Sequence, residues 1–493
     1  MQEKTRGVSK PNVCPFIDGR RVPSHGNRTM PSVNPATGEV LWQVPMGHPD
    51  DVDDAVRAAR RAFDTGPWRS DADLRARCLL QLADIIEERA AEVAQLDTTE
   101  IGIPLDVTTA DAVACASIVR EIVDMLPDVN ADAVAPSVRV PRGVVAVIAP
   151  WNFPFFVALT KVMPALAVGN TVVLKPTEFA SASAVVLAEM AHDAGVPAGV
   201  LNVVVGDGAV VGDALVRHPL IDQVNLTGSL ATGRRVLAAS AESTLVPVVT
   251  ELGGKSAHVV GEHAPDLDIV ADAIAASIFW CAGQVCTAGS RVIVTEQHHD
   301  ALVAKLVDRV AHWTGNDPMS PGVQAGPLGS EAHRRLVQAK VASAVDEGAE
   351  LRCGGVPSDG PGSFYPPTIL TGVQANHRVF RDEVFGPVLA VTVCRSVDHG
   401  IELANDTVYG LVATGWSTDA DESHRLAVGL RAAWVTVNPH GSPPHNPRAG
   451  AESLRCSGSG VEGGLPGLRA ATDRKSTRLN SSHSSVSRMP SSA

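Results

Sequence analysis

The spacing of apolar residues changes along this chain from a helical to a strand-like period. After an opening strand-and-turn region at residues 16–44, residues 51–63 and 74–96 carry apolar positions at intervals of three and four. In the first of these stretches the apolar positions are Val52, Ala55, Val56, Ala59 and Phe63. Such spacing predicts amphipathic helices.

From residue 143 onward the apolar residues gather in short β-branched runs. These runs lie at residues 144–148, 171–174 and 201–205, and alanine-rich stretches of helical period separate them. Residues 255–430 repeat the alternation. Strands alternating with helices predict parallel sheets covered on both faces, so we predict an α/β protein with two α/β domains.

Length, charge and cysteine content narrow the class of protein. The 493 residues suffice for two or three domains, and no apolar run reaches the ~18 residues of a membrane span. The polar N-terminus does not resemble a secretory signal, and eight irregularly spaced cysteines suit a reducing compartment. A net charge of -13 argues against nucleic-acid and anionic-membrane partners. We therefore expect a cytoplasmic protein.

Two short segments offer reactive groups among small residues. Residues 283–286 read Gly-Gln-Val-Cys, and residues 251–255 read Glu-Leu-Gly-Gly-Lys. Cys286 is a candidate thiol nucleophile, and Glu251 is a candidate general base. The plain alternatives are a buried structural cysteine and a Glu–Lys salt bridge. Together the segments indicate covalent catalysis at a thiol, followed by hydrolysis.

Further motifs appear in a fixed order around these two. They are Pro-Trp-Asn-Phe-Pro at 150–154, Leu-Lys-Pro-Thr-Glu at 174–178, Leu-Thr-Gly-Ser at 226–229 and Glu-Val-Phe-Gly-Pro at 383–387. The ordered set resembles the aldehyde dehydrogenase superfamily, whose members oxidise aldehydes with NAD(P), from about residue 16 to about residue 473. The resemblance implies a Rossmann-like NAD-binding domain, an α/β catalytic domain and a small β module for oligomerisation into a homodimer or homotetramer.

The resemblance also sets the expected domain boundaries. We predict an NAD-binding domain at residues 1–122 and 143–253, and a catalytic domain at 254–432. Residues 123–142 would form a shortened bridging hairpin, and 433–473 a C-terminal bridging segment. This segment departs from the family, which usually reads Pro-Phe-Gly-Gly where residues 447–453 stand here, although Ser-Gly-Ser-Gly at 457–460 keeps the family's form.

The last twenty residues, 474–493, have a different composition. They contain eight serines, four basic residues and no acid, so they cannot bury a helix or strand face. Their Arg-Lys-Ser-Thr-Arg-Leu-Asn-Ser-Ser-His string resembles translated sequencing-adapter text. We interpret 474–493 as a disordered, non-native tail that replaces the family's terminal strand; an ordinary disordered tail is the alternative.

The resemblance assigns catalytic roles to four residues. Cys286 would attack the aldehyde to give a thiohemiacetal, and the Asn152 amide would stabilise the oxyanion together with the Cys286 backbone N–H. Glu251 would activate the water that hydrolyses the resulting thioester. Lys161 would belong to the proton path, or it is a surface lysine. Asn152 is otherwise an ordinary turn residue.

The implied cofactor site lacks a G-x-G-x-x-G motif. Instead, Gly228, Ser229 and Gly233 follow a strand-like run and would bind the pyrophosphate at a helix N-terminus. The remaining cofactor residues would be Lys175 and Glu178 at the adenine-side ribose, Glu383 at the nicotinamide-side ribose, Phe385 near the nicotinamide ring, and Trp151 and Leu252. The carboxylate at position 178 favours NAD over NADP, because it would repel a 2′-phosphate.

No metal site is evident, because the adjacent His298 and His299 would diverge in a strand. Two other functions stay open. A CoA-acylating semialdehyde dehydrogenase is opposed by Glu251, which that branch typically lacks. An inactive family member that serves as a binding or structural protein is opposed by the intact Cys286, Glu251 and Asn152.

Overall fold

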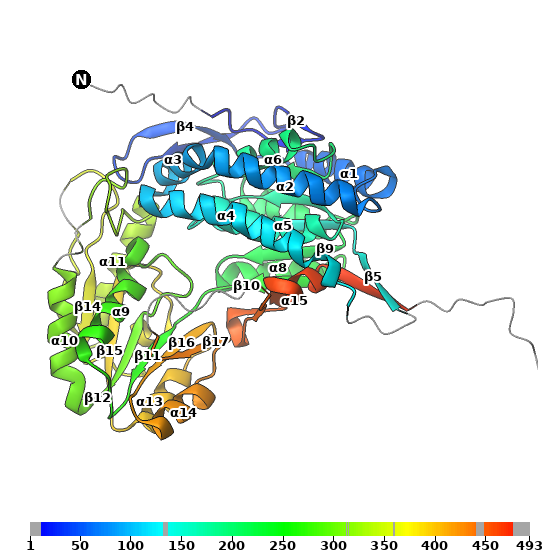
Figure 1. The fold of residues 1–493 in the computed structure, drawn as a ribbon. Helices are drawn as coiled ribbons and strands as arrows, with labels where there is room; N and C mark the ends of the chain where they lie inside the picture. The colour runs from blue at the N-terminus through cyan, green and yellow to red at the C-terminus, as the bar shows by residue number, and fades with distance from the viewer. Residues whose placement is uncertain are drawn as a thin grey trace, which may run out of the picture.

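Two large β-sheets, each covered by helices, make up most of the molecule (Figure 1). The structure is a computed structural model that describes residues 11–131, 137–311, 313, 315–357, 360–439 and 448–476. The first sheet and its helices lie above the second sheet in the view of Figure 1. The chain passes from one sheet to the other between β10 (Val248–Glu251) and β11 (Ala257–Val260).

The first sheet has eight strands in the order β19-β10-β9-β6-β7-β8-β1-β2. Its five central strands are parallel, and the strands at both ends are antiparallel. The other bounds are β1 (Phe16–Ile17), β2 (Arg20–Arg21), β6 (Val144–Ile148), β7 (Thr171–Lys175), β8 (Leu201–Val203), β9 (Gln223–Thr227) and β19 (Gly458–Ser459).

Alternate residues of this first sheet face two separate cores. One core packs against α1, α7 and α8, and the other packs against α2 to α6. Because both faces are covered, β7 is buried throughout, as its continuous apolar run predicts. The helices are α1 (Pro49–Thr65), α2 (Ala72–Glu88), α3 (Ala90–Ile101), α4 (Leu105–Met125), α5 (Pro154–Ala167), α6 (Ala182–Asp193), α7 (Asp213–Arg217) and α8 (Leu230–Glu242).

The second sheet has seven strands in the order β13-β14-β15-β12-β11-β16-β17, and only β13 is antiparallel to its neighbour. Helices α9 and α10 cover one face, and α13 and α14 cover the other. The strands are β12 (Arg291–Thr295), β13 (Glu350–Cys353), β14 (Thr368–Thr371), β15 (Val388–Cys394), β16 (Val412–Trp416) and β17 (Trp434–Val437). The helices are α9 (Leu267–Phe279), α10 (Glu296–Val310), α11 (Glu331–Asp346), α12 (Arg378–Arg381), α13 (Val397–Asn405) and α14 (Ala420–Gly429).

The α/β prediction is therefore confirmed, and the element boundaries shift by a few residues. The run at 144–148 is β6, whereas the run at 201–205 ends as a strand at Val203. The stripe at 74–96 is divided between α2 and α3, which are joined at Arg89. The opening strand-and-turn region contains β1, β2, β3 (Thr29–Val33) and β4 (Val40–Pro45).

The predicted hairpin at 123–142 is wrong in the described residues. Helix α4 runs on to Met125, and a short 3-10 turn follows at Leu126–Asp128. The single strand here, β5 (Ser137–Pro141), pairs with β21 (Thr472–Ser476) from the C-terminus. The apolar face of α4 continues into the first core, so the helix outlasts the predicted boundary.

Two predictions for the C-terminal region also need correction. Strand β21 extends through Ser476, so the first three residues of the predicted tail are paired with β5. Backbone pairing does not depend on an apolar side chain, which is why composition missed it. Residues 477–493 lie outside the described residues. The predicted bridging segment 433–473 supplies strands to both large sheets, β17 and β19, in addition to β18 (Ala451–Glu452), β20 (Val461–Glu462) and α15 (Gly464–Ala470).

Trp68 offers a test of the first core. Its side chain is fully buried, and its Nε1 donates to the Leu166 carbonyl at 3.1 Å. We expect Trp68→Ala to lower the free energy of unfolding by about 3–5 kcal/mol, since it leaves a large cavity and an unpaired carbonyl. Denaturant unfolding measures this loss. Trp434→Ala, at a half-exposed position on β17, is the matched control and should cost far less; equal losses would contradict the assignment of Trp68 to the core.

Candidate active site

A strained turn carries the candidate nucleophile. After α9 the backbone of Cys281, Ala282 and Gly283 adopts positive φ angles of 50°, 54° and 67°. A side chain at position 283 would overlap the Gly386 carbonyl, so only glycine lets the two loops approach. Cys281 is buried in this turn and not on the preceding helix, and both it and Cys286 are free thiols. The turn that precedes Cys286 therefore lies against the loop around Gly386.

Asn152 is fixed to the same turn, two residues before the thiol. Its Nδ2 donates to the Gln284 carbonyl at 2.9 Å. The buried Gln284 side chain accepts from the Gly329 N–H at 2.8 Å and donates to the Cys281 and Pro327 carbonyls. Sequence reasoning did not single out Gln284, although it lies within the motif at 283–286. The structure thus brings Asn152 and the Cys286 turn together.

Glu251 stands at the C-terminal end of β10. Its Oε2 accepts a hydrogen bond from Ser453 Oγ at 2.5 Å, and its Oε1 is buried with no hydrogen-bond partner among the described residues. Burial and the charge of Glu462 raise the pKa of Glu251 to about 7, against the opposing effects of Ser453 and Lys161. A carboxylate with this pKa can exchange protons at neutral pH.

Lys161 is buried on α5 and pairs with the Glu462 carboxylate. The alternative of a surface lysine is therefore wrong. Because Lys161 and Glu462 both act on the pKa of Glu251, the three charges form one electrostatic group.

The Gly-Gly pair after Glu251 lets two other segments come close. Gly254 N–H donates to Glu383 Oε1 at 3.0 Å, and a side chain at Gly253 would overlap the Glu383 carboxylate. A Cβ at Gly254 would lie 2.5 Å from the Cys286 carbonyl oxygen. Leu252, which stands between Glu251 and Gly253 in the chain, is buried. Both glycines are therefore required by contacts across the site.

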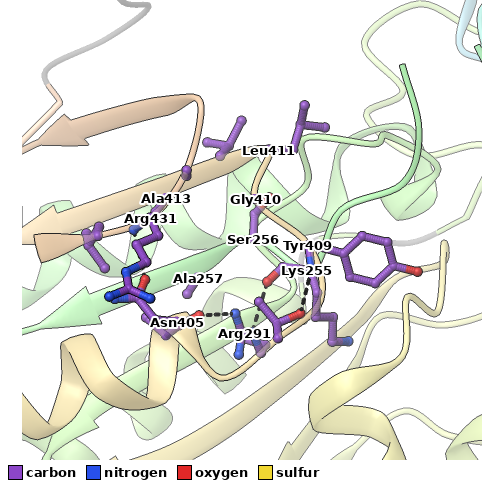
Figure 2. Close-up of a pocket in the computed structure, with 15 residues that line it drawn as sticks. Lys255, Ser256, Ala257, Arg291, Asn405, Tyr409, Gly410, Leu411, Ala413 and Arg431 are labelled. Carbon is purple, nitrogen blue, oxygen red and sulfur yellow. Dashed lines mark hydrogen bonds between the residues drawn. The ribbon is translucent and has the colours of Figure 1, made fainter. Parts of the chain in front are cut away.

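Lys255 continues this segment into the second sheet. Arg291 Nε donates to the Lys255 carbonyl at 2.9 Å, and both residues are labelled in Figure 2. The Lys255 ammonium has no hydrogen-bond partner among the described residues. Burial, with Arg291 and Lys340 nearby, lowers the pKa of Lys255 to about 7. Arg291 thereby anchors the end of the Gly-Gly segment.

An aromatic cluster borders the thiol turn. Trp151 meets His333 and Phe385 edge to face, with ring centroids 5.3 and 5.4 Å apart. His333 Nε2 donates to the Phe385 carbonyl at 2.7 Å. Phe385 has φ of 60°, which is a strained value for a residue with a side chain. Sequence reasoning did not anticipate His333.

The predicted phosphate-binding turn joins β9 to α8. Ser229 caps α8 by accepting from the Thr232 N–H at 3.2 Å, and Gly228 N–H donates to the Glu251 carbonyl at 3.0 Å. A Cβ at Gly233 would lie 2.6 Å from Leu252 Cδ1, so this glycine lets the helix approach the site. The N-terminal amides of such a helix suit an anion.

Lys175 and Glu178 lie at the end of β7, in the same sheet as the phosphate-binding turn. The buried Lys175 ammonium donates to the Pro176 carbonyl at 2.9 Å and to Glu178 Oε2 at 3.4 Å. Burial lowers the pKa of Lys175. These side chains and the α8 N-terminus fit a dinucleotide that lies across the ends of parallel strands.

The thiol itself is strongly perturbed. Burial, followed by the charges of Glu383 and Glu251, raises the pKa of Cys286 to about 11. The thiol is therefore protonated at neutral pH, and a thiol in this state needs a base to become a thiolate.

The model of the aldehyde dehydrogenase family matches residues 22–477. The chain belongs to the aldehyde dehydrogenase family. It is 42% identical over 432 residues to the aminoacetaldehyde dehydrogenase of Pseudomonas aeruginosa, covering 86% of this chain and 87% of the relative. It is 35% identical to the betaine aldehyde dehydrogenase of Bacillus subtilis, over 96% and 98% of the two chains.

Solved structures agree with this membership. An indole-3-acetaldehyde dehydrogenase in complex with NAD+ superposes with a TM-score of 0.92 at 34% identity, covering 95% of this chain and 97% of that one. An NAD-dependent aldehyde dehydrogenase from Sinorhizobium meliloti superposes with a TM-score of 0.90 at 35% identity, with 96% of each chain covered. The predicted family and Rossmann-like α/β architecture are thus confirmed.

The part of the chain that the structure describes was expected to hold neither a metal site nor a membrane span. Within it, no group of three or more His, Cys, Asp or Glu side chains could hold a metal ion. His298 and His299 lie in α10 and not in a strand, so the reason given for their divergence is wrong. No described helix is both long and apolar enough to cross a membrane.

The perturbed thiol of this aldehyde dehydrogenase gives a test that needs no turnover. Glu383→Gln removes one negative charge near Cys286. We therefore expect the pKa of the Cys286 thiol to fall, and alkylation of this thiol by iodoacetamide at pH 8 to accelerate by about three- to tenfold. Alkylation rates measured across pH, with Cys286→Ala as the blank, check this. Glu242→Gln, on the exposed part of α8, should leave the rate unchanged. Equal rates in wild type and Glu383→Gln would show that this carboxylate does not act on the thiol.

Proposed function

We propose that this aldehyde dehydrogenase oxidises an aldehyde to its carboxylic acid with NAD as the hydride acceptor. The reaction passes through a thiohemiacetal and a thioester at Cys286, and water activated by Glu251 hydrolyses the thioester. The observation that carries the proposal is that two carboxylates, Glu251 and Glu383, act on one partly buried thiol, while Glu251 itself has a pKa of about 7.

The first step needs a deprotonated thiol. Glu251 accepts the proton of Cys286, and the thiolate then bonds to the aldehyde carbon. The amide of Asn152, which lies against the thiol turn, donates to the developing oxyanion together with the Cys286 backbone N–H. One such donor is worth about 3–4 kcal/mol in the transition state.

Bound NAD supplies the hydride acceptor. The protein would hold it at the α8 N-terminus, where Gly228, Ser229 and Gly233 would bind the pyrophosphate and Leu252 would support this turn. Glu383 would bind the nicotinamide-side ribose, and Trp151 and Phe385 would pack near the nicotinamide ring. Lys175 and Glu178 would bind the adenine-side ribose, where the carboxylate favours NAD over NADP. The NAD+ complex of a structural relative supports this choice.

Hydrolysis uses the same carboxylate a second time. Glu251 accepts a proton from water, and the hydroxide oxygen attacks the thioester carbon as the C–S bond breaks. The Lys161–Glu462 pair beside Glu251 offers the next positions for that proton. A carboxylate so close to the thiol favours water over CoA as the acyl acceptor. The intact nucleophile, base and amide favour an active enzyme over a binding protein.

We place the enzyme in the cytoplasm as a homodimer or homotetramer. The β5–β21 ribbon is paired only within itself in the described residues, so its outer edges can accept strands from another subunit. This feature supports assembly despite the altered C-terminus.

The substrate we propose is an aldehyde that carries a positively charged nitrogen. Relatives named for aminoacetaldehyde and betaine aldehyde support this class. On α4, Asp111 lies one turn from Val107, which packs in a cluster with Phe153 and Trp280. Those two rings stack at 5.8 Å, and the Asp111 charge reaches Cys281 in the thiol turn. A carboxylate beside aromatic rings suits an ammonium group.

The chemistry is tested by NADH formation with a panel of aldehydes, without CoA. We expect Cys286→Ala to abolish turnover, and Asn152→Ala to lower kcat by about 10²–10³-fold. Glu251→Gln should lower the rate of thioester hydrolysis by a factor at least as large as the loss of kcat in Asn152→Ala. Since the pKa of Glu251 is about 7, wild-type kcat should fall as pH drops below that value, because the protonated acid is no base. NAD binding without turnover in folded wild-type protein would support the inactive alternative.

The substrate class is tested by comparing aminoacetaldehyde and betaine aldehyde with propionaldehyde. We expect Asp111→Asn to lower kcat/KM for the two cations by about tenfold and to leave propionaldehyde within about twofold, since only the ammonium group meets the carboxylate. Asp106→Asn, on the exposed first turn of the same helix, is the matched control. A parallel loss with all three aldehydes would contradict a charge-specific role.

A further inference from the structure

The segment around Ser457 is fastened to the end of the strand that carries Glu251. Leu252 N–H donates to the Ser457 carbonyl at 2.7 Å, and Ser457 Oγ donates to the Gly253 carbonyl at 2.8 Å. Strand β19 pairs with β10 directly at Glu251. These contacts fix the segment relative to the carboxylate along one edge of the strand, opposite the edge that pairs with β9.

Within this fixed segment, the Ser453 hydroxyl meets the carboxylate. Its Oγ donates to Glu251 Oε2 at 2.5 Å, and the residue is only 4% exposed, so water has little access to replace it. Ser453 Cβ lies 2.9 Å from the place that a Cβ at Gly458 would take, so this glycine gives the serine room. The other oxygen, Glu251 Oε1, has no partner among the described residues. One hydroxyl therefore orients the whole carboxylate.

We propose that Ser453 is a positioning residue for thioester hydrolysis, holding Glu251 by Oε2 so that Oε1 is free to take the proton of the attacking water. This inference rests on the proposed function of Glu251. In this step Oε1 accepts one proton, the water oxygen bonds to the carbonyl carbon, and the C–S bond breaks. The electron pair of that bond goes to Cys286 Sγ, which then recovers the proton.

The surrounding charges compete over the protonation state of Glu251, and the Ser453 hydroxyl contributes to that balance. Burial and the charge of Glu462 on β20 both favour the protonated acid, whereas the Ser453 hydroxyl and Lys161 on α5 favour the carboxylate. The charge of Glu251 in turn raises the pKa of the Cys286 thiol. Without the hydroxyl, the balance moves toward the protonated acid, which cannot act as a base.

Ser453 lies within a departure noted in the sequence. Ser453 is the last residue of the stretch 447–453, where this chain differs from the Pro-Phe-Gly-Gly usual in the family. Of the described residues in that stretch, Ser453 is the one whose side chain bonds to the proposed catalytic group. The substitution of this stretch thus adds a hydroxyl to the site.

The experiment measures kcat and the pre-steady-state NADH burst between about pH 5.5 and 9 for wild type, Ser453→Ala and Ser453→Thr. We expect Ser453→Ala to move the acid limb of kcat up by about one pH unit, so that kcat near pH 6 falls about tenfold and kcat near pH 9 stays within about twofold. Ser453→Thr keeps a hydroxyl and should restore the wild-type limb. The burst at high pH should persist in all three proteins, because acylation of Cys286 is still possible.

Ser459→Ala is the matched control, because it removes a hydroxyl of the same segment that contacts Thr250 and not Glu251. An acid limb that is unchanged in Ser453→Ala, or moved equally by Ser459→Ala, overturns the proposal. Glu251→Gln measured alongside separates the two ideas. If it stops hydrolysis while Ser453→Ala has no effect, only the positioning role fails; if it hydrolyses at the wild-type rate, both fail.

Discussion

The close packing of backbone at Gly253 and Gly254 is the constraint on which the site depends. One glycine leaves room for the Glu383 carboxylate, and the other for the Cys286 carbonyl. A side chain at either position would separate the two sheets at the place where they must meet. The short segment from Glu251 to Lys255 therefore joins the end of β10 to the start of β11 and holds acid and thiol at one point.

Charge follows from this packing. Bringing a thiol and two carboxylates together in a poorly hydrated place raises the pKa of Cys286 to about 11 and that of Glu251 to about 7. At neutral pH the Cys286 thiol is therefore held more firmly in its protonated form, whereas Glu251 is poised between carboxylic acid and carboxylate. The Lys161–Glu462 pair and the Ser453 hydroxyl then adjust how readily Glu251 gains or loses a proton. The reactivity of the site is thus a property of the assembled group and not of any one side chain.

Sequence reasoning succeeded where a residue's environment is local. Continuous β-branched runs such as 144–148 predicted buried parallel strands, because a strand covered on both faces needs apolar side chains on both. It failed where long-range pairing decides the structure. Strand β5 pairs with β21 across about two thirds of the chain, and polar residues such as Lys475 form part of that pairing through their backbone.

The sequence by itself determined the family, the two α/β sheets and the candidate nucleophile, base and amide, because these depend on ordered motifs and local periodicity. Tertiary structure decided which further groups meet them. Ser453, Gln284 and His333 lie far along the chain from at least one of their partners, and no local pattern marks a hydroxyl, an amide or an imidazole for such a contact. Only the folded backbone sets those distances, since hydrogen bonds and charges act through space and not along the sequence.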